Sequence, residues 1–61
     1  MHLLRRIERF LRKSDMPATR FGRETVRDPR FVFDLRSGRE PRSDTERRVH
    51  DWLDARERQA R

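Results

Sequence analysis

Apolar residues recur along the chain at spacings typical of amphipathic helices. Over residues 2–13 they fall at i, i+1, i+4, i+7 and i+8, which places five side chains on one face of a helix: Leu3, Leu4, Ile7, Phe10 and Leu11. The other face is basic, and Glu8 stands four residues before Arg12, the favourable order for an intrahelical ion pair. A transit peptide or a membrane-surface helix has a similar pattern. We favour a helix of a folded domain, because the segments that follow need a helix to pack against.

A second, shorter helix is predicted over residues 17–26. Pro17 suits its first turn, where a missing N–H has no partner to lose. Its inward positions are Phe21, Thr25 and Val26. Gly22 is unusual inside a helix, where it costs about 1 kcal/mol relative to alanine. This suggests that another backbone segment passes close to it.

A third helix is predicted from a strong start signal, because Asp28 is an N-cap acceptor and Pro29 suits the first helical position. This helix, over residues 29–37, has three large apolar residues on or beside its inward face: Phe31, Val32 and Leu35. It ends before Gly38, a residue suited to the position after a helix. Residues 30–35 also have the pattern of a short strand, but the cap and the glycine favour a helix.

A fourth helix is predicted to begin at Ser43. Residues 43–46 have the sequence of a capping box, with Ser43 as the N-cap and the Glu46 side chain reaching back to it. Three apolar residues follow at helical spacing: Val49, Trp52 and Leu53. We expect Trp52 to pack against the first helix. No large apolar residue occurs later, so the chain divides into a domain over residues 1–55 and a frayed basic tail over residues 56–61. The four segments predict an all-α fold, a compact four-helix bundle.

The composition limits the functions that this fold can serve. The chain has 61 residues, of which 46% are charged and 31% hydrophobic, with 17 Lys and Arg against 11 Asp and Glu. A chain of this length forms one small domain with a minimal core. Mixed charges and periodic apolar positions favour a folded domain over a disordered basic peptide. The net charge of +6 favours a nucleic-acid partner over a merely solvated surface.

Several classes of function are not expected. The chain has no cysteine and two histidines, which excludes a thiolate or histidine-only zinc site. Acidic pairs such as Asp51 and Asp54 fall on a helix surface, without the burial that tunes acid–base groups. No apolar run approaches the roughly 20 residues that span a bilayer. We therefore expect no enzyme activity, cofactor, metal, small-molecule ligand or membrane partner, and a cytoplasmic, nucleoid-associated protein.

Two short helices joined by a tight turn form a helix-turn-helix arrangement. Residues 18–38 carry further features of it: Phe21 followed by the small Gly22, Asp28 as the polar N-cap of the second helix, and Val32 and Leu35 as its buried aliphatic positions. Gly38 and Pro41 then form a Gly-x-x-Pro exit, and Val49 to Leu53 looks like the helix that follows. On these positions the chain resembles the lambda repressor/Cro-like (XRE-type) helix-turn-helix family, in a minimal four-helix version. Val26 stands where that family usually has the glycine of the turn.

The helix over residues 29–37 is the one expected to enter the major groove of duplex DNA. With its aliphatic positions buried, the opposite face carries four candidate base-reading residues: Arg30, Phe33, Asp34 and Ser37. Arg30 can bond guanine O6 and N7, Phe33 can pack on a thymine methyl, and Asp34 can accept from cytosine N4 or support an arginine. Phe33 is equally suited to the core. Candidate phosphate contacts lie on the flanks: Thr19, Arg20, Arg23, Arg39 and Arg42.

The sequence thus predicts a sequence-specific double-stranded DNA-binding protein, a small transcriptional regulator such as a phage, mobile-element or antitoxin-like repressor. Because one helix reads few base pairs, we expect a weak homodimer on paired half-sites. Two alternatives remain open. One is a protein-interaction adaptor that binds an acidic surface of the transcription machinery, and the other is a nonspecific basic nucleic-acid binder.

Overall fold

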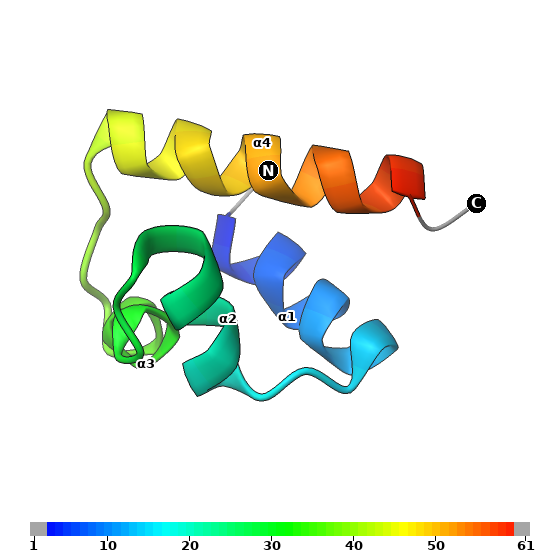
Figure 1. Cartoon of the computed structure of the whole chain (residues 1–61). Helices are drawn as coiled ribbons and strands as arrows, with labels where there is room; N and C mark the ends of the chain where they lie inside the picture. The colour runs from blue at the N-terminus through cyan, green and yellow to red at the C-terminus, as the bar shows by residue number, and fades with distance from the viewer. Residues whose placement is uncertain (1–2, 60–61) are drawn as a thin grey trace.

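The computed structural model describes residues 3–59 and contains four α-helices over that range (Figure 1): α1 Leu3–Ser14, α2 Ala18–Val26, α3 Phe31–Arg36 and α4 Ser43–Gln59. No strand occurs among these residues. The all-α fold class expected from the sequence is therefore confirmed. His2, placed in the first predicted helix, and residues 60 and 61 of the predicted tail lie outside the described residues.

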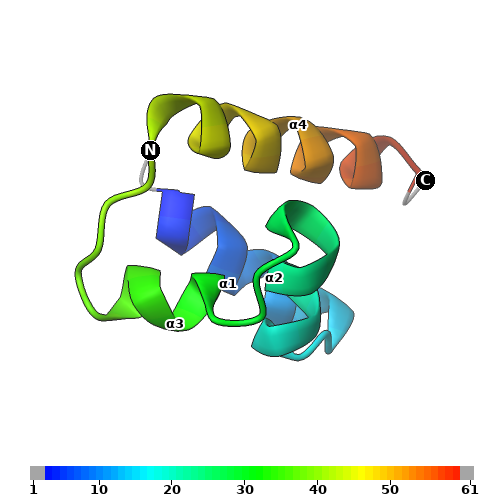
Figure 2. The ribbon, with the colours of Figure 1, turned by 60° about the vertical axis from the view of Figure 1, so that its left-hand side comes forward.

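The four helices pack unequally on one another. Helix α2 contacts both α3 and α4, and α1 also contacts both of them. Helix α4, the longest, lies along one side of the molecule, and α3 lies on the side away from it (Figures 1 and 2). Helix α3 therefore has one face turned inward, toward α1 and α2, and one face turned outward.

Every helix contributes to a single small core. Eight hydrophobic side chains are buried in it: Leu3, Ile7, Phe21, Phe31, Val32, Leu35, Val49 and Leu53. Seven others pack against its edge and are partly buried: Leu4, Phe10, Leu11, Met16, Ala18, Val26 and Trp52. The inward positions predicted from helical spacing are all in these two groups or, for Thr25, buried with its hydroxyl donating to the Phe21 carbonyl at 2.8 Å.

An aromatic cluster joins α1, α2 and α4. The Trp52 ring meets Phe10 and Phe21 edge-on, with centroid separations of 5.4 and 5.3 Å. Phe10 and Phe21 lie 5.8 Å apart. Edge-to-face pairs at such distances stabilise a core by about 0.5–1.5 kcal/mol each beyond their buried area. The expected packing of Trp52 against the first helix is confirmed.

The connection between α2 and α3 passes directly over Gly22, as its sequence position suggested. A Cβ atom at Gly22 would stand 2.2 Å from the Asp28 carbonyl oxygen and 3.2 Å from the Phe31 Cβ. The Asp28 N–H also donates to the Gly22 carbonyl at 3.1 Å. The glycine is required here because the backbone of the connection occupies the space of a side chain.

Helix α3 is shorter than the sequence predicted, beginning at Phe31 and not at Pro29. The Asp28 carboxylate accepts the Arg30 N–H at 2.9 Å, and the Asp28 carbonyl accepts the Phe31 N–H at 3.1 Å. Asp28 thus closes a turn over residues 28–31, and the first helical residue follows this turn. The predicted N-cap at Asp28 is therefore wrong: Arg30 precedes the first helical residue without a side-chain cap bond, and the helix start was placed two residues too early.

The end of α3 matches its prediction closely. Gly38 has φ of +97°, and its N–H donates to the Leu35 carbonyl at 3.0 Å. The Arg39 N–H donates to the Asp34 carbonyl, also at 3.0 Å. These two bonds form a Schellman motif, in which a left-handed glycine ends the helix. Because residues 31–36 form this helix, the alternative prediction of a short strand over residues 30–35 is wrong.

Helix α4 departs from the sequence prediction at both ends. Ser43 is its first residue, and the Glu46 N–H donates to the Arg42 carbonyl at 2.9 Å, so Ser43 is not the N-cap of a capping box. The helix also runs to Gln59, through most of the predicted frayed tail. One reason is Arg56, whose guanidinium lies 4.7 Å from the centre of the Trp52 ring. This contact ties the last turns of the helix to the core.

Candidate nucleic-acid interface

The outward face of α3 and the two residues that flank the helix carry three of the four candidate base-reading residues. Phe33, whose role the sequence left open between core and surface, is 44% exposed and is the exposed large hydrophobic residue of the described chain. Arg30, immediately before α3, and Ser37, immediately after it, are also exposed. The Ser37 hydroxyl donates to the Phe33 carbonyl at 3.1 Å. These residues lie at i, i+3 and i+7 and form one stripe along the helix.

The fourth candidate, Asp34, lies on the flank of this stripe and is partly buried. One of its carboxylate oxygens is 3.4 Å from the Arg39 guanidinium. Of the two roles considered for Asp34, this contact fits the support of an arginine better than the acceptance of a bond from cytosine. Arg39, a candidate phosphate contact, is thereby held beside the end of α3.

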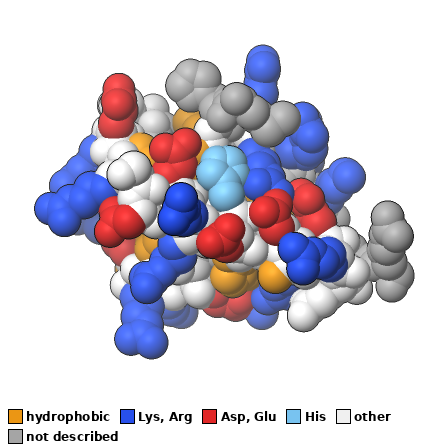
Figure 3. All heavy atoms as spheres, turned by 90° about the horizontal axis from the view of Figure 1, so that it is seen from above, with side chains coloured by type: hydrophobic (Ala, Val, Ile, Leu, Met, Phe, Trp, Pro, Cys, Tyr) orange, Lys and Arg blue, Asp and Glu red, His pale blue; other side chains and the backbone are white. Residues whose placement is uncertain are grey.

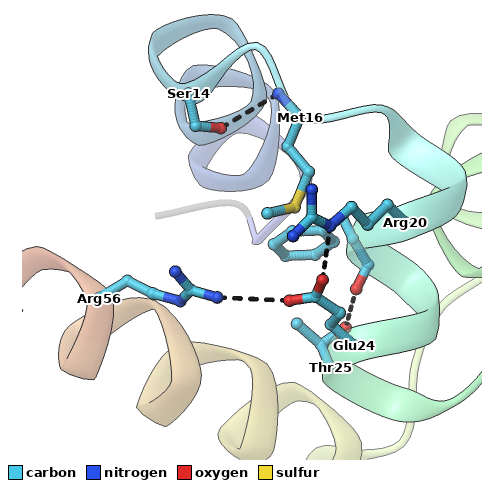
Figure 4. A network of polar contacts seen from close by, with 7 residues as sticks. Ser14, Met16, Arg20, Glu24, Thr25 and Arg56 are labelled. Atoms are coloured by element: carbon cyan, nitrogen blue, oxygen red, sulfur yellow. Dashed lines mark hydrogen bonds and ion pairs between the residues drawn. The ribbon is translucent and has the colours of Figure 1, made fainter.

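Three candidate phosphate contacts lie on α2 and are exposed: Thr19, Arg20 and Arg23. Thr19 and Arg20 occupy the first turn, where backbone N–H groups lack intrahelical partners and favour anions. Arg20 also lies 2.6 Å from Glu24, and Glu24 lies 3.3 Å from Arg56 of α4 (Figure 4). The Arg20 charge is therefore partly compensated within the protein, whereas Arg23 has no acidic partner within residues 3–59.

The left-handed residue of the connection is Arg27, with φ of 58° and ψ of 31°. Val26, which the resemblance placed at the turn position of glycine, is the last residue of α2. The turn is thus made one residue later, at an arginine. A non-glycine residue in this conformation costs about 1–2 kcal/mol, which the bonds of Asp28 to the end of α2 and the start of α3 offset.

The structure adds an ion pair that the sequence did not indicate. Arg36 of α3 reaches Glu8 of α1, with its Nε and one Nη atom each 2.8 Å from a carboxylate oxygen. The hydrogen bonds from Arg36 lower the pKa of Glu8, and the Glu8 carboxylate raises the pKa of Arg36. The same guanidinium lies 5.6 Å from the centre of the Phe33 ring. A separation of 28 residues leaves no trace in local sequence pattern, so only the fold could reveal this contact.

A second cluster missed by the sequence joins α1 to α4. The sequence predicts the basic residues of the first helix on the face opposite its apolar one, but the Arg6 side chain of α1 is only 16% exposed. It bonds Asp54, lies 3.3 Å from Glu57 and donates to His50 Nδ1 at 2.7 Å. The bond from Arg6 lowers the pKa of Asp54. This arginine therefore joins α1 to α4.

Charge is distributed unevenly over the helices. Helix α4 has five Asp and Glu against four Arg, whereas α1 has five Arg and Lys against one Glu. Seen from the α4 side, several acidic side chains lie near the centre of the face, with Lys and Arg side chains between and around them (Figure 3). The excess of cations therefore belongs to the rest of the molecule, which includes the connections before and after α3.

Within residues 3–59, no group of three or more His, Cys, Asp or Glu side chains is placed to hold a metal ion. Over the same residues, no helix combines the length and apolar character needed to cross a membrane. Comparison of the chain with protein-family models, curated proteins and solved structures found no match.

Proposed function

We propose that the protein binds double-stranded DNA sequence-specifically, with α3 in the major groove, as a small transcriptional regulator. The observation that carries this proposal is the exposed stripe on α3 formed by Arg30, Phe33 and Ser37. A small domain has few large apolar side chains to spare, and an exposed phenylalanine beside arginines suits the edges of base pairs. Helix α2 ends at Val26 and α3 begins at Phe31, so a short connection joins them, as in the helix-turn-helix arrangement.

Phosphate contacts would come from both sides of the stripe. Arg23 of α2 and Arg42 of the connection to α4 are exposed and form no ion pair with an acidic side chain within residues 3–59. Thr19, Arg20 and Arg39 complete a set of five. Neutralising about five phosphates gives a slope near −4 to −5 in a plot of log affinity against log salt. Binding with this slope and no sequence preference would indicate the nonspecific alternative.

The decisive experiment is a selection from a random duplex DNA library at low and physiological salt. We expect an enriched motif that survives the higher salt, with two half-sites about one helical turn apart if the weak homodimer forms on DNA. Arg30→Ala should relax the preference at one position of the motif. Arg48→Ala, an exposed arginine of α4, is the matched control and should leave the motif unchanged. Enrichment that disappears with salt and leaves no motif would refute specific binding.

A protein-interaction adaptor remains the second candidate, because an open groove lies between α1 and the connection that follows α3. Leu4, Leu35 and Pro41 supply apolar surface in it, and its charged lining has four arginines, Arg5 and Arg9 among them, against three glutamates. Such a lining suits an acidic segment with apolar anchors. The double substitution Arg5→Glu and Arg9→Glu should weaken binding to a protein partner and leave the DNA motif unchanged. Arg30→Ala should instead alter the DNA motif and leave binding to the protein partner unchanged.

A further inference from the structure

We propose that Phe33 and Arg36 together read a thymine beside a guanine, and that Glu8 positions Arg36 for this contact. The inference rests on the proposed DNA binding and adds a base-reading residue and a positioning residue to it. The three side chains are linked through space. Glu8 holds the Arg36 fork with two bonds of 2.8 Å, and the Arg36 guanidinium lies 5.6 Å from the Phe33 ring centre.

The way in which Glu8 holds Arg36 leaves the arginine able to bond a base. An arginine has five N–H donors in a planar fork. Glu8 takes the edge formed by Nε and Nη2, so the end formed by Nη1 and the second Nη2 hydrogen stays available. That end can donate to O6 and N7 of guanine together. The Arg36 side chain is 41% exposed and reaches the solvent beside the stripe.

The distance between the two groups decides how far apart their bases lie. Base pairs are stacked about 3.4 Å apart along a duplex. The 5.6 Å between the Arg36 guanidinium and the Phe33 ring centre is less than two such steps. The two side chains therefore suit neighbouring base pairs. Phe33 is the exposed apolar surface that a C5-methyl group needs, and thymine is the base that presents one in the major groove.

A purely structural ion pair between Glu8 and Arg36 would have a different signature. It would contribute to the stability of the domain, and its loss would weaken binding to all DNA sequences alike. A positioning role instead requires that changing Glu8 alter the preference for guanine at one position. The charge-preserving Arg36→Lys separates the two, because lysine keeps the positive charge but lacks the fork.

The test uses the duplex obtained from the library selection and base analogues that remove one group at a time. Deoxyuridine replaces each thymine and lacks only the methyl, and 7-deazaguanine replaces each guanine and lacks N7. Affinities are measured for the parent protein, Phe33→Ala, Arg36→Lys, Glu8→Gln and the control Arg48→Lys. Thermal unfolding of each variant establishes that it is folded; Phe33 is exposed enough for Phe33→Ala to keep the fold.

We expect deoxyuridine at one position to weaken the parent about fourfold, the effect of one methyl group, and to have no effect on Phe33→Ala. We expect 7-deazaguanine at the neighbouring position to weaken the parent by about fivefold or more. This effect should shrink in Arg36→Lys, whose ammonium lacks the planar fork, shrink in Glu8→Gln and persist in Arg48→Lys. The inference would be overturned if the analogues had no effect on binding to the selected motif, or had the same effect on the parent and on the variants. Either result would leave the proposed DNA specificity standing. A selection without any motif would overturn the proposed DNA specificity and this inference with it.

Discussion

The close approach of the α2–α3 connection to Gly22 makes Gly22→Ala a sharp test of the fold. Alanine ordinarily stabilises a helix interior by about 1 kcal/mol relative to glycine. Here the added Cβ would stand 2.2 Å from the Asp28 carbonyl oxygen, and Cβ atoms essentially never approach closer than 3.0 Å. The carbonyl belongs to the backbone and must retreat by about 0.8 Å or more, the kind of overpacking that costs about 1–3 kcal/mol.

The retreat has a further consequence, because the Asp28 carbonyl accepts the Phe31 N–H at the start of α3. Weakening that hydrogen bond adds about 1 kcal/mol to the destabilisation. After the gain in helix propensity is subtracted, Gly22→Ala should lower the free energy of unfolding by about 1–3 kcal/mol. A domain of this size is stable by about 3–9 kcal/mol, so the effect is a large fraction of the total.

Urea unfolding followed by the fluorescence of Trp52, the single tryptophan, measures this change. Arg23→Ala is the matched control, since Arg23 is the exposed neighbour of Gly22 on α2. It should alter stability by no more than about 0.5 kcal/mol. A Gly22→Ala variant as stable as the parent, or more stable, would refute the close approach on which the α2–α3 geometry depends.

Three further predictions concern the turn between α2 and α3, the loss of stability at acid pH and the end of α4. Arg27→Gly should raise the free energy of unfolding by up to about 1 kcal/mol in urea unfolding, because glycine adopts the left-handed conformation of this residue without strain; a destabilised variant would contradict this. The Arg36 bonds lower the pKa of Glu8 from its ordinary value of 4.5, so this ion pair contributes fully above pH 4.5 and its contribution is lost as pH falls through the folded-state pKa. Glu8→Gln should therefore flatten the fall of the thermal midpoint in acid, and an unchanged slope would count against the pair. Arg56→Ala should destabilise by about 1 kcal/mol through its lost contacts with Trp52 and Glu24, and amide exchange should show faster opening beyond residue 55; no change would mean that α4 holds its end without them.

Much of the fold follows from local pattern. The periods of the apolar residues identified the four helices and the inward positions of each, because an apolar face at helical spacing can be buried in only one way. Gly38 indicated the end of α3, since a left-handed residue after a helix favours glycine. Gly22 indicated a close backbone, because the energetic penalty of glycine inside a helix needs a compensating contact.

The helix boundaries were decided by tertiary contacts. Helix α3 begins at Phe31 and not at the predicted Pro29, because the carbonyl and carboxylate of Asp28 form a separate turn before it. The end of α4 moved to Gln59, where the local sequence predicted fraying. Arg56 contacts Trp52 of its own helix and Glu24 of α2, and the isolated helix would lack the second contact.

In the candidate interface, too, some features followed from the local sequence and others only from the tertiary structure. The sequence by itself indicated three outward residues, Arg30, Phe33 and Ser37, because burial of Val32 and Leu35 fixes the opposite face. It also placed Asp34 there, which lies partly buried on the flank, and it omitted the exposed Arg36. It left Phe33 between core and surface, and only the packing of α1, α2 and α4 showed that the core closes without it. The ion pair between Glu8 and Arg36 joins helices 28 residues apart. Side chains so distant along the chain meet only when the whole domain is folded, and tertiary structure alone therefore decided which arginine lies beside Phe33.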